Sequence, residues 1–363
     1  MPAHRLCTIA LTAILASSSH CFVVHAALAI QEVVATPDAG LFTLIDDSGS
    51  GARGLSGLTY DQTNNRFYAV GDSDSRLFPI DLELDLNTGV IRRGAILKPL
   101  QFRTADGLAK TGGDREGVAF NVDNQSVWVA SEGEPNATKL PYAPTVTEHR
   151  LTDGYQTNSL RLPSVYTSAN VNGARRNKSI ESLTIGQDGT KWIANEEALK
   201  QDGPTSNPLL GTVVRLTRIN NDGETTGQFA YQVDTALVVS GVSELLALPG
   251  GELVVMERAV NGGTFRIRLY EIDFSKATDI RAIRTLDGSE SKVAKKQLWE
   301  RVFPLQHNEA QTNFEGLTLG PAINDGSGDR CLVLVADNDH SASRTNHNFY
   351  ALRISGAESS PVK

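Results

Sequence analysis

The chain has 363 residues and a formal net charge of −8, from 34 Lys and Arg against 42 Asp and Glu, and 40% of its residues are hydrophobic. This length and composition are typical of a globular protein with a substantial buried core. The acidic excess argues against a nucleic-acid backbone or an anionic membrane surface as partner, and it favours a protein that collects cations.

The N-terminus has the pattern of a secretory signal. Residues 1–5 form a short basic start, residues 6–16 form an apolar stretch too short to span a bilayer, and small residues precede cleavage points after Ala26 or Ala29. We therefore expect residues 1–29 to be a signal peptide and the mature protein to be secreted or periplasmic. No later segment holds about 18 consecutive apolar residues, so stable membrane insertion is not expected.

A pattern of two short apolar runs, opened and closed by polar residues, recurs five times along the rest of the chain. The copies are SGLTYD followed by FYAVGDSD, EGVAF by VWVASEGE, ESLTI by KWIANEE, ELLAL by LVVMER, and EGLTL by LVLVADND. They open at Ser56, Glu116, Glu181, Glu244 and Glu315. A repeat of roughly 60–70 residues built from paired strands indicates the blades of a β-propeller.

Each copy is interpreted as an antiparallel hairpin. In the second copy, residues 117–120 form the first strand, 121–125 are rich in turn residues, and 126–130 form the second strand. The start of the first strand and the end of the second lie side by side in such a hairpin, so Glu116 and Glu132 share one end of the sheet. Propeller symmetry then places all opening and closing residues around one mouth of the central channel. The closing residues are Asp72, Glu132, Glu196, Glu257 and Asp337.

The outer strands of the blades follow each hairpin in chain order. They are predicted at 76–84 and 90–98, 145–151 and 158–163, 212–219 and 228–233, 265–274 and 298–304, and 349–354. The last blade lacks one strand, which residues 30–35 would supply by pairing the two ends of the chain. The sequence thus predicts an all-β fold, a single propeller over residues 30–356, with a flexible tail at 357–363. Five blades are favoured, and six are the alternative.

The ordered motifs resemble those of a known family. EGVAF with SEGE, IESLTI with ANEE, SELLALPGG with MER, and FEGLTL with ADND are similar to the phytase-like family, whose members carry the "esterase-like activity of phytase" domain. The resemblance covers nearly the whole mature chain. It implies a propeller fold, export from the cytoplasm, and hydrolysis of phosphoesters or esters.

Clustered carboxylates at one mouth raise the pKa values of one another or gather a cation. Oxygen ligands suit Ca²⁺, whereas no cysteine cluster or close histidine pair indicates zinc. We therefore expect Ca²⁺ as a cofactor. Its predicted ligands are Glu244, Glu315, Asp72, Glu132, Glu196 and Asp337. The alternative interpretation of each acid is structural, because a carboxylate at a blade edge also accepts hydrogen bonds from turn amides.

The predicted catalytic residues are Glu116 and Glu181, as carboxylates that exchange protons with a hydrolytic water and a leaving group. Basic residues stand beside the acids and would bind an anionic, phosphorylated substrate, although each of them equally serves to neutralise its neighbouring acid. They are Arg115, Lys178, Arg258 and Arg53.

Three functions remain open from the sequence. The first is an exported calcium-dependent phosphoester hydrolase of phytase-like type that acts at the acidic mouth. The second is a non-catalytic propeller that binds a ligand or protein and holds structural calcium. The third is a calcium-dependent carboxylester or lactone hydrolase. Whether the protein is an enzyme is therefore undecided at this stage. We expect a monomer with a small anionic substrate.

Overall fold

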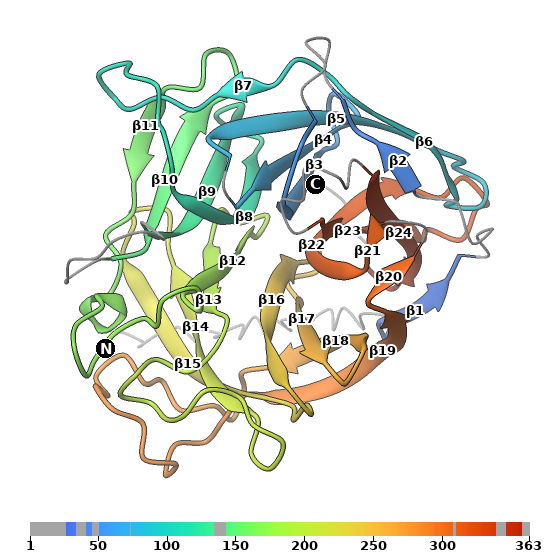
Figure 1. The fold of residues 1–363 in the computed structure, drawn as a ribbon. Coiled ribbons are helices and arrows are strands. Elements are labelled where there is room, and N and C mark those ends of the chain that lie inside the picture. The colour runs from blue at the N-terminus through green and yellow to red at the C-terminus, as the bar shows by residue number, and fades with distance from the viewer. Residues whose placement is uncertain are drawn as a thin grey trace, which may run out of the picture.

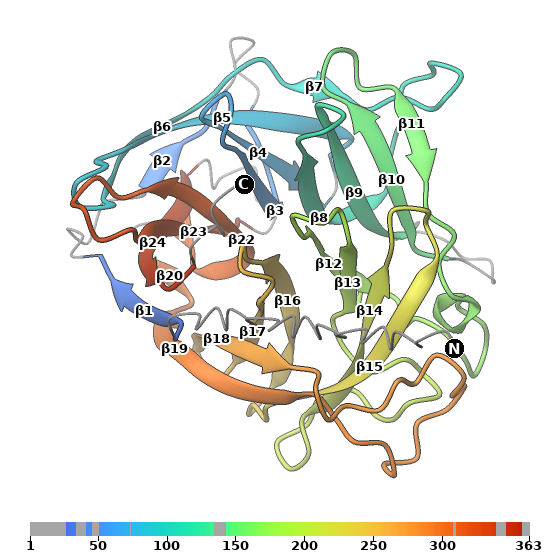
Figure 2. The same ribbon diagram turned by 180° about the vertical axis from the view of Figure 1, so that it is seen from behind.

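The protein is a five-bladed β-propeller in the computed structural model (Figure 1), which describes residues 27–33, 41–45, 51–72, 74–133, 143–307, 310–338 and 346–357. Each blade is an antiparallel sheet with four strands in its main path, and the view from the opposite end shows the same ring of sheets around one channel (Figure 2). The prediction of an all-β propeller with five blades is confirmed, and the six-bladed alternative is wrong.

The blades follow the chain order. Blade I contains β3 (Leu55–Asp61), β4 (Arg66–Gly71), β5 (Arg76–Leu84) and β6 (Ile91–Ile96), with β7 (Leu100–Gln101) beside β5. Blade II contains β8 (Asp114–Asn121), β9 (Ser126–Gly133), β10 (Thr145–Arg150) and β11 (Gln156–Ser159). Blade III contains β12 (Ile180–Ile185), β13 (Lys191–Asn195), β14 (Thr212–Ile219) and β15 (Thr225–Val233).

Blade IV contains β16 (Val239–Ala247), β17 (Leu253–Val260), β18 (Thr264–Asp273) and β19 (Ala294–Pro304). Blade V contains β22 (Asn313–Ala322), β23 (Arg330–Asp337) and β24 (Asn346–Ser355). Its outer neighbours come from the N-terminal part of the chain, because both β1 (Ala29–Glu32) and β2 (Leu41–Thr43) pair with β24. A short hairpin of β20 (Gln306–His307) and β21 (Ala310–Gln311) precedes blade V, and the 3₁₀ turn η1 (Ser164–Tyr166) follows blade II.

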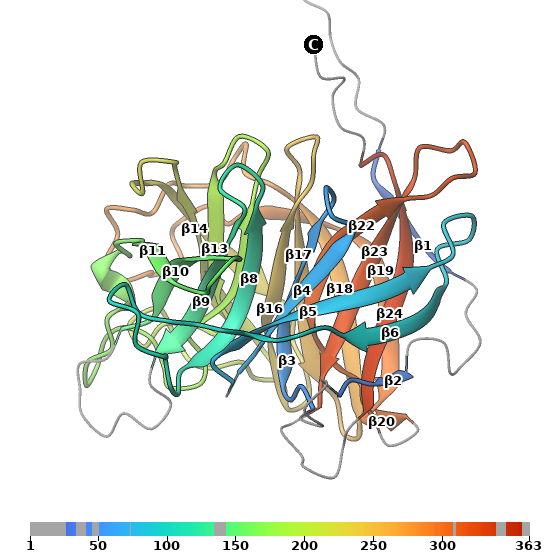
Figure 3. The same cartoon turned by 90° about the horizontal axis from the view of Figure 1, so that it is seen from above.

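The first strand of every blade lines the channel. β3, β8, β12, β16 and β22 contact one another in this order around the ring, and the side view shows the blades standing side by side (Figure 3). Apolar side chains of these strands narrow the channel to a cavity of about 140 Å³. They include Leu58, Val118, Leu183, Leu245 and Leu317.

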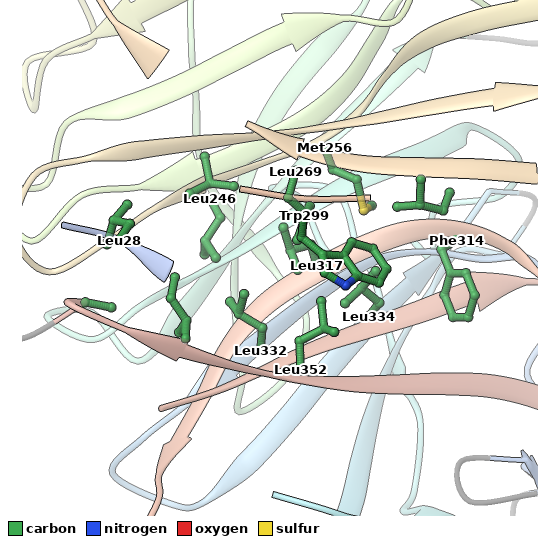
Figure 4. Close-up of a cluster of buried hydrophobic side chains, with 14 of the residues drawn as sticks. Leu28, Leu246, Met256, Leu269, Trp299, Phe314, Leu317, Leu332, Leu334 and Leu352 are labelled. Atoms are coloured by element: carbon green, nitrogen blue, oxygen red, sulfur yellow. The ribbon is translucent and has the colours of Figure 1, made fainter. Parts of the chain in front are cut away.

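The core lies between neighbouring blades. The largest cluster of buried apolar residues joins blades IV and V, where Met256 and Leu269 face Phe314 and Leu334 (Figure 4). Leu28 belongs to the same cluster and is buried, so the chain is already part of the fold two residues after the first predicted cleavage point. The predicted signal itself lies almost wholly in residues 1–26, outside the described part of the chain. Among the described residues, no helix is long and apolar enough to cross a membrane.

Close packing of the inner strands requires small residues. A Cβ atom on Gly117 would lie 2.6 Å from the backbone nitrogen and 2.9 Å from the Cβ of Leu183 in the next blade. By contrast, a Cβ atom on Gly51 would meet only the carbonyl oxygen of Leu44 at 3.5 Å, an ordinary contact.

We expect Gly117→Ala to lower the free energy of unfolding by about 1–3 kcal/mol, because the inner strands of blades II and III must separate to admit a methyl group. Gly51→Ala is the matched control and should change it by less than about 0.5 kcal/mol. Urea unfolding of both variants measures the difference. Equal stability of Gly117→Ala and the wild type would show that the inner strands do not pack as described.

Candidate functional site at the channel mouth

One extra residue interrupts the hydrogen-bond register of each inner strand near the channel mouth. The register with the second strand shifts between Leu55 and Gly57 in blade I, and the corresponding shifts follow Arg115, Ile180, Val242 and Phe314 in the other blades. Such β-bulges leave a residue out of the ladder and change the direction of its side chain. The residues at this point are Ser56, Glu116, Glu181, Ser243 and Glu315.

The second strand of each blade supplies another equivalent position. The residue before each bulge pairs with a residue of the second strand, for example Ile180 with Asn195 and Val242 with Glu257. The next residue along the second strand stands at the mouth beside the bulge. These residues are Asp72, Glu132, Glu196, Arg258 and Asp337.

Glu116 and Glu181 form the centre of the acidic cluster. Both are buried, and neither accepts a hydrogen bond from the described residues. Burial raises the pKa of Glu116 well above its ordinary value, and the charges of Glu181, Glu315 and Glu132 raise it further. Burial likewise raises the pKa of Glu181, together with the charges of Glu196, Glu132 and Glu315. Two buried carboxyls that oppose each other's ionisation can hold different protonation states, which is the requirement for a general acid and a general base.

Glu132 and Glu196 bring blades II and III together. Glu132 accepts a hydrogen bond from the backbone nitrogen of Ser179, and burial and the charge of Glu196 raise its pKa. Glu196 accepts from the Lys178 ammonium at 2.7 Å, and Lys178 also lies 3.5 Å from Glu197. Burial alone would lower the pKa of Lys178, but the charge and hydrogen bond of Glu196 together with the charge of Glu181 outweigh it and raise the pKa to about 12. Lys178 is therefore a permanent cation at the mouth.

Arg258 links three blades. Its guanidinium donates to Glu196 at 2.8 Å and to Asn313 at 2.5 Å, and it lies 2.8 Å from Glu315. Asn313 donates in turn to Glu315 at 2.8 Å and to Asp337 at 3.5 Å. Burial raises the pKa of Glu315 to about 8, with Asp337 raising it and Arg258 opposing the rise. The guanidinium thus occupies a position that an acid fills in the other four blades.

The predicted alignment of blade IV is off by one residue. The sequence pattern equates Glu244 with Glu116 and Glu181, whereas the register makes Ser243 their equivalent. Glu244 follows the bulge and accepts hydrogen bonds from the backbone nitrogens of Leu183 at 3.2 Å and Leu245 at 3.0 Å, so its carboxylate binds the channel wall.

The closing acid predicted for blade IV also lies elsewhere. Glu257 accepts from the Tyr231 hydroxyl and the Lys295 ammonium, each at 2.6 Å, between blades III and IV. The alternation of side chains along a strand explains the difference, because it turns Glu257 away from the face that Arg258 occupies.

The remaining predicted residues lie at blade I and the gap beside it. Asp72 follows β4 at the predicted position, and its backbone carbonyl accepts from the Arg115 nitrogen at 3.2 Å. Arg115 is buried, and its guanidinium donates to the carbonyls of Asp74 at 3.0 Å and Gly112 at 2.7 Å. These bonds hold it between blades I and II, apart from Lys178 and Arg258. Arg53 is exposed and forms no ion pair with a described residue.

Sequence reasoning missed the residues two positions before each bulge. Asp114 raises the pKa of Glu116, Ser179 donates its backbone nitrogen to Glu132, and Asn313 holds Arg258 and Glu315 together. Extending the repeat by two residues upstream would have found them, because three of the five copies carry a polar side chain there.

The donor set of the mouth fits a hard cation. Its side chains offer only oxygen ligands, and the acids outnumber the two cations, Arg258 and Lys178. In their present arrangement, no group of three or more His, Cys, Asp or Glu side chains among the described residues has the geometry of a metal site. Glu196 and Glu315 instead face Arg258. Calcium therefore remains a prediction. Its oxygen donors are present at the mouth, but their side chains would have to move together to bind an ion.

Comparison with known proteins places the chain in a family. Residues 50–340 match the phytase-like family described as "Esterase-like activity of phytase". The chain belongs to this family. The matched region contains every mouth residue from Ser56 to Asp337, with the whole of blades I to IV and the two inner strands of blade V, so the predicted phytase-like membership is confirmed. No curated protein sequence matches the chain.

Solved structures with a similar fold are distant. Hydrazine synthase from Kuenenia stuttgartiensis has 12% identity and a TM-score of 0.35, and the match covers 80% of this chain and 58% of that one. A putative oxidoreductase (glucose dehydrogenase) from Thermus thermophilus has 12% identity and a TM-score of 0.39, with 91% and 100% covered. A gluconolactonase from Xanthomonas campestris has 12% identity and a TM-score of 0.40, with 91% and 96% covered. At this level of similarity none of them carries an argument about the activity of the phytase-like chain.

When a chelator keeps the mouth free of calcium, the negative charge of ionised Glu116 should lower the free energy of unfolding. A carboxyl whose pKa is raised by folding favours the folded state below about pH 4.5, and this contribution is lost as the pH rises toward the folded pKa. Glu116→Gln removes the charge, so we expect it to raise the free energy of unfolding by about 1–3 kcal/mol at pH 8 and by little at pH 4. Urea unfolding at the two pH values measures this.

Glu148→Gln is the matched control for Glu116→Gln. Glu148 is a buried acid at the other end of blade II, where hydrogen bonds from Ser126, Asn124 and Asn121 outweigh burial and lower its pKa. Its contribution is present above its ordinary pKa and lost on acidification, so its replacement should lower stability at pH 8. If Glu116→Gln lowered the free energy of unfolding at pH 8 as Glu148→Gln does, the charge of Glu116 could not be uncompensated in the folded protein.

Proposed function

We propose that this phytase-like propeller is an exported, calcium-dependent phosphoester hydrolase that acts at the channel mouth. The observation that carries the proposal is the pair of Glu116 and Glu181, two buried carboxyls that accept no hydrogen bond from the described residues. Burial raises the pKa values of both, the charge of Glu181 raises that of Glu116 further, and the cations Arg258 and Lys178 lie near Glu181. Export is supported by the signal pattern in the sequence, and cleavage after Ala26 would leave the buried Leu28 in the mature fold.

The cations select the substrate. Arg258 presents a planar guanidinium that suits two oxygens of a phosphoryl group, and Lys178 adds a point charge from the neighbouring blade. A neutral ester would gain little from either residue. Arg258 is 15% exposed and Lys178 is 26% exposed at the side chain, so a ligand can reach both from the solvent.

The two central carboxyls divide the proton transfers. Glu181 in its ionised form accepts the proton of the attacking water, while Glu116 in its protonated form donates a proton to the leaving oxygen as the phosphorus–oxygen bond breaks. The products are inorganic phosphate and an alcohol. Burial raises the pKa values of both groups well above the ordinary value of a glutamate, which favours a protonated form for the acid.

Calcium would be held by carboxylates of blades I, II, III and V. These are Asp72, Glu132, Glu196, Glu315 and Asp337. A bound calcium ion supplies charge for the phosphoryl oxygens and lowers the pKa of a coordinated water. Glu244 is left out of this set because its carboxylate binds two backbone nitrogens in the channel wall.

Substitution of either central acid should abolish phosphate release while the fold is kept. With p-nitrophenyl phosphate and phytate as substrates, we expect Glu116→Gln and Glu181→Gln to reduce kcat by roughly 10²–10⁴, the usual contribution of a general acid or base. Glu148→Gln is the control, because it removes a buried acid from the far end of blade II. Circular dichroism verifies folding.

The same assay separates the competing functions. Turnover of aryl esters or lactones without phosphate release would indicate an ester hydrolase instead of a phosphoester hydrolase. No turnover of any of these substrates in the presence of calcium would indicate a propeller that binds a ligand without catalysis. Phosphate release that survives both central substitutions would place the reaction elsewhere in the molecule.

Calcium should stabilise the folded protein. Because an ion that binds only the folded state raises the apparent stability, we expect millimolar CaCl₂ to raise Tm by roughly 3–8 °C and a chelator to reverse it. The double variant Glu132→Gln/Glu196→Gln should lose most of this shift, whereas Glu148→Gln should keep it. An unchanged wild-type Tm in about 10 mM CaCl₂, well above the dissociation constants of the weakest extracellular calcium sites, would refute the calcium prediction.

A further inference from the structure

Four large apolar side chains are exposed on two loops at the mouth end of blades III and IV. Leu209 and Leu210 lie between β13 and β14 and are 86% and 70% exposed. Leu237 and Val238 lie between β15 and β16 and are 68% and 59% exposed. Single exposed apolar residues are ordinary, but a group of them rimmed by polar residues is typical of a binding surface. We call these four residues the apolar rim.

Hydrogen bonds hold the two loops in place. The Ser240 nitrogen donates to the Ser206 hydroxyl at 2.9 Å and so joins one loop to the other. Gln232 donates to the Leu210 carbonyl at 2.8 Å, and the Leu237 nitrogen donates to Asn261 at 2.9 Å. The apolar side chains are therefore displayed by anchored backbone, which lowers the entropy lost when a ligand covers them.

The apolar rim stands next to the cationic side of the mouth. The Ser206 nitrogen donates to Glu197 at 2.7 Å, and the other carboxylate oxygen of Glu197 lies 3.5 Å from the Lys178 ammonium. Leu209 follows Ser206 by three residues, so their Cα atoms are at most about 11 Å apart, and Val238 is within about 7 Å of Ser240 on the same basis. One ligand of moderate size spans the distance from Lys178 to this rim.

Blade IV gives the arrangement a direction. Arg258 replaces the closing acid of the other blades, so the cations of the mouth come from blades III and IV, the same blades whose loops carry the apolar rim. Acids of the neighbouring blades border the same cations, since Arg258 lies 2.8 Å from Glu315 of blade V and both Lys178 and Arg258 pair with Glu196 of blade III. A ligand that places its anion on Lys178 and Arg258 can extend its remaining part over the loops of the same two blades, which carry Leu209 and Leu237.

We infer that the mouth takes an amphiphilic phosphoester, with its phosphoryl group on Lys178 and Arg258 and its alkyl chain on the apolar rim. The inference rests on the proposed function and deepens it by naming the substrate class. The ligand is a monomeric alkyl phosphate, since the acidic surface of the whole protein opposes docking on an anionic membrane.

The test compares methyl phosphate with octyl phosphate, both below the concentration at which octyl phosphate forms micelles. Each methylene that is buried adds about fourfold, and partial burial of the chain should therefore raise kcat/KM for octyl phosphate by roughly 30-fold or more over methyl phosphate. Leu209→Ser/Leu237→Ser should reduce this ratio below about fivefold and leave methyl phosphate unchanged. Val122→Ser, at an exposed apolar residue in the turn between β8 and β9, is the control and should keep the ratio.

A binding measurement keeps the inference separate from catalysis. Octylphosphonate and methylphosphonate, which lack the scissile bond, are titrated calorimetrically into the full-length mature protein. Absence of turnover together with tighter, rim-dependent binding of octylphosphonate would refute the hydrolase and retain the amphiphile site. Equal affinity for the two phosphonates would overturn the inference whatever the activity. A wild-type dimer that the double serine variant converts to a monomer would also overturn it, because a second copy would then cover the rim.

Discussion

One extra residue in each inner strand decides where the acidic side chains of this propeller lie. A regular strand would alternate its side chains between the two faces of the blade, and the acids would pack between blades, where an unpaired charge is costly. The bulge interrupts this alternation at the same point in all five blades. It directs Glu116, Glu181 and Glu315 into the mouth, where burial raises their pKa values and the charges of neighbouring carboxylates raise them further. The narrow channel below them is lined by the same strands.

Blade IV differs from the other blades because Arg258 takes the position of their closing acid, so positive charge is present on one side of the mouth. The acids of the mouth repel one another, and Arg258 acts as a counter-ion that pairs with Glu196 and Glu315 from the two neighbouring blades. Asn313 fixes the guanidinium from a third direction. The result is a cationic edge beside Lys178 and a carboxyl pair, Glu116 and Glu181, whose lone pairs meet no donor from the described part of the chain. An anion that enters such a mouth would meet both the cations and the carboxyls proposed to transfer protons.

Much of this arrangement was accessible from the sequence, and the failures have definite causes. Strands predicted at 76–84 and 212–219 agree with β5 and β14, because their apolar alternation and flanking turns are strong. In blade IV, adjacent polar pairs, Ser243 with Glu244 and Glu257 with Arg258, allow two alignments, and only the hydrogen-bond register decides between them. Ser56, which opens the first copy, indicates that a serine can occupy this position, and Ser243 of blade IV is its equivalent. Burial of Arg115 under loop carbonyls depends on contacts between blades, which no local pattern encodes.

The central claim is that the carboxyls and cations of one mouth form a single functional centre. A crystal structure of the mature protein soaked with calcium and inorganic phosphate tests it most directly, because anomalous scattering locates the ion independently of any assay. We expect a calcium peak among Glu132, Glu196 and Glu315, with Arg258 turned from these acids toward a phosphate beside Glu116 and Glu181. A mouth that keeps Arg258 paired with Glu196 and Glu315, and calcium or phosphate bound elsewhere on the propeller, would contradict it.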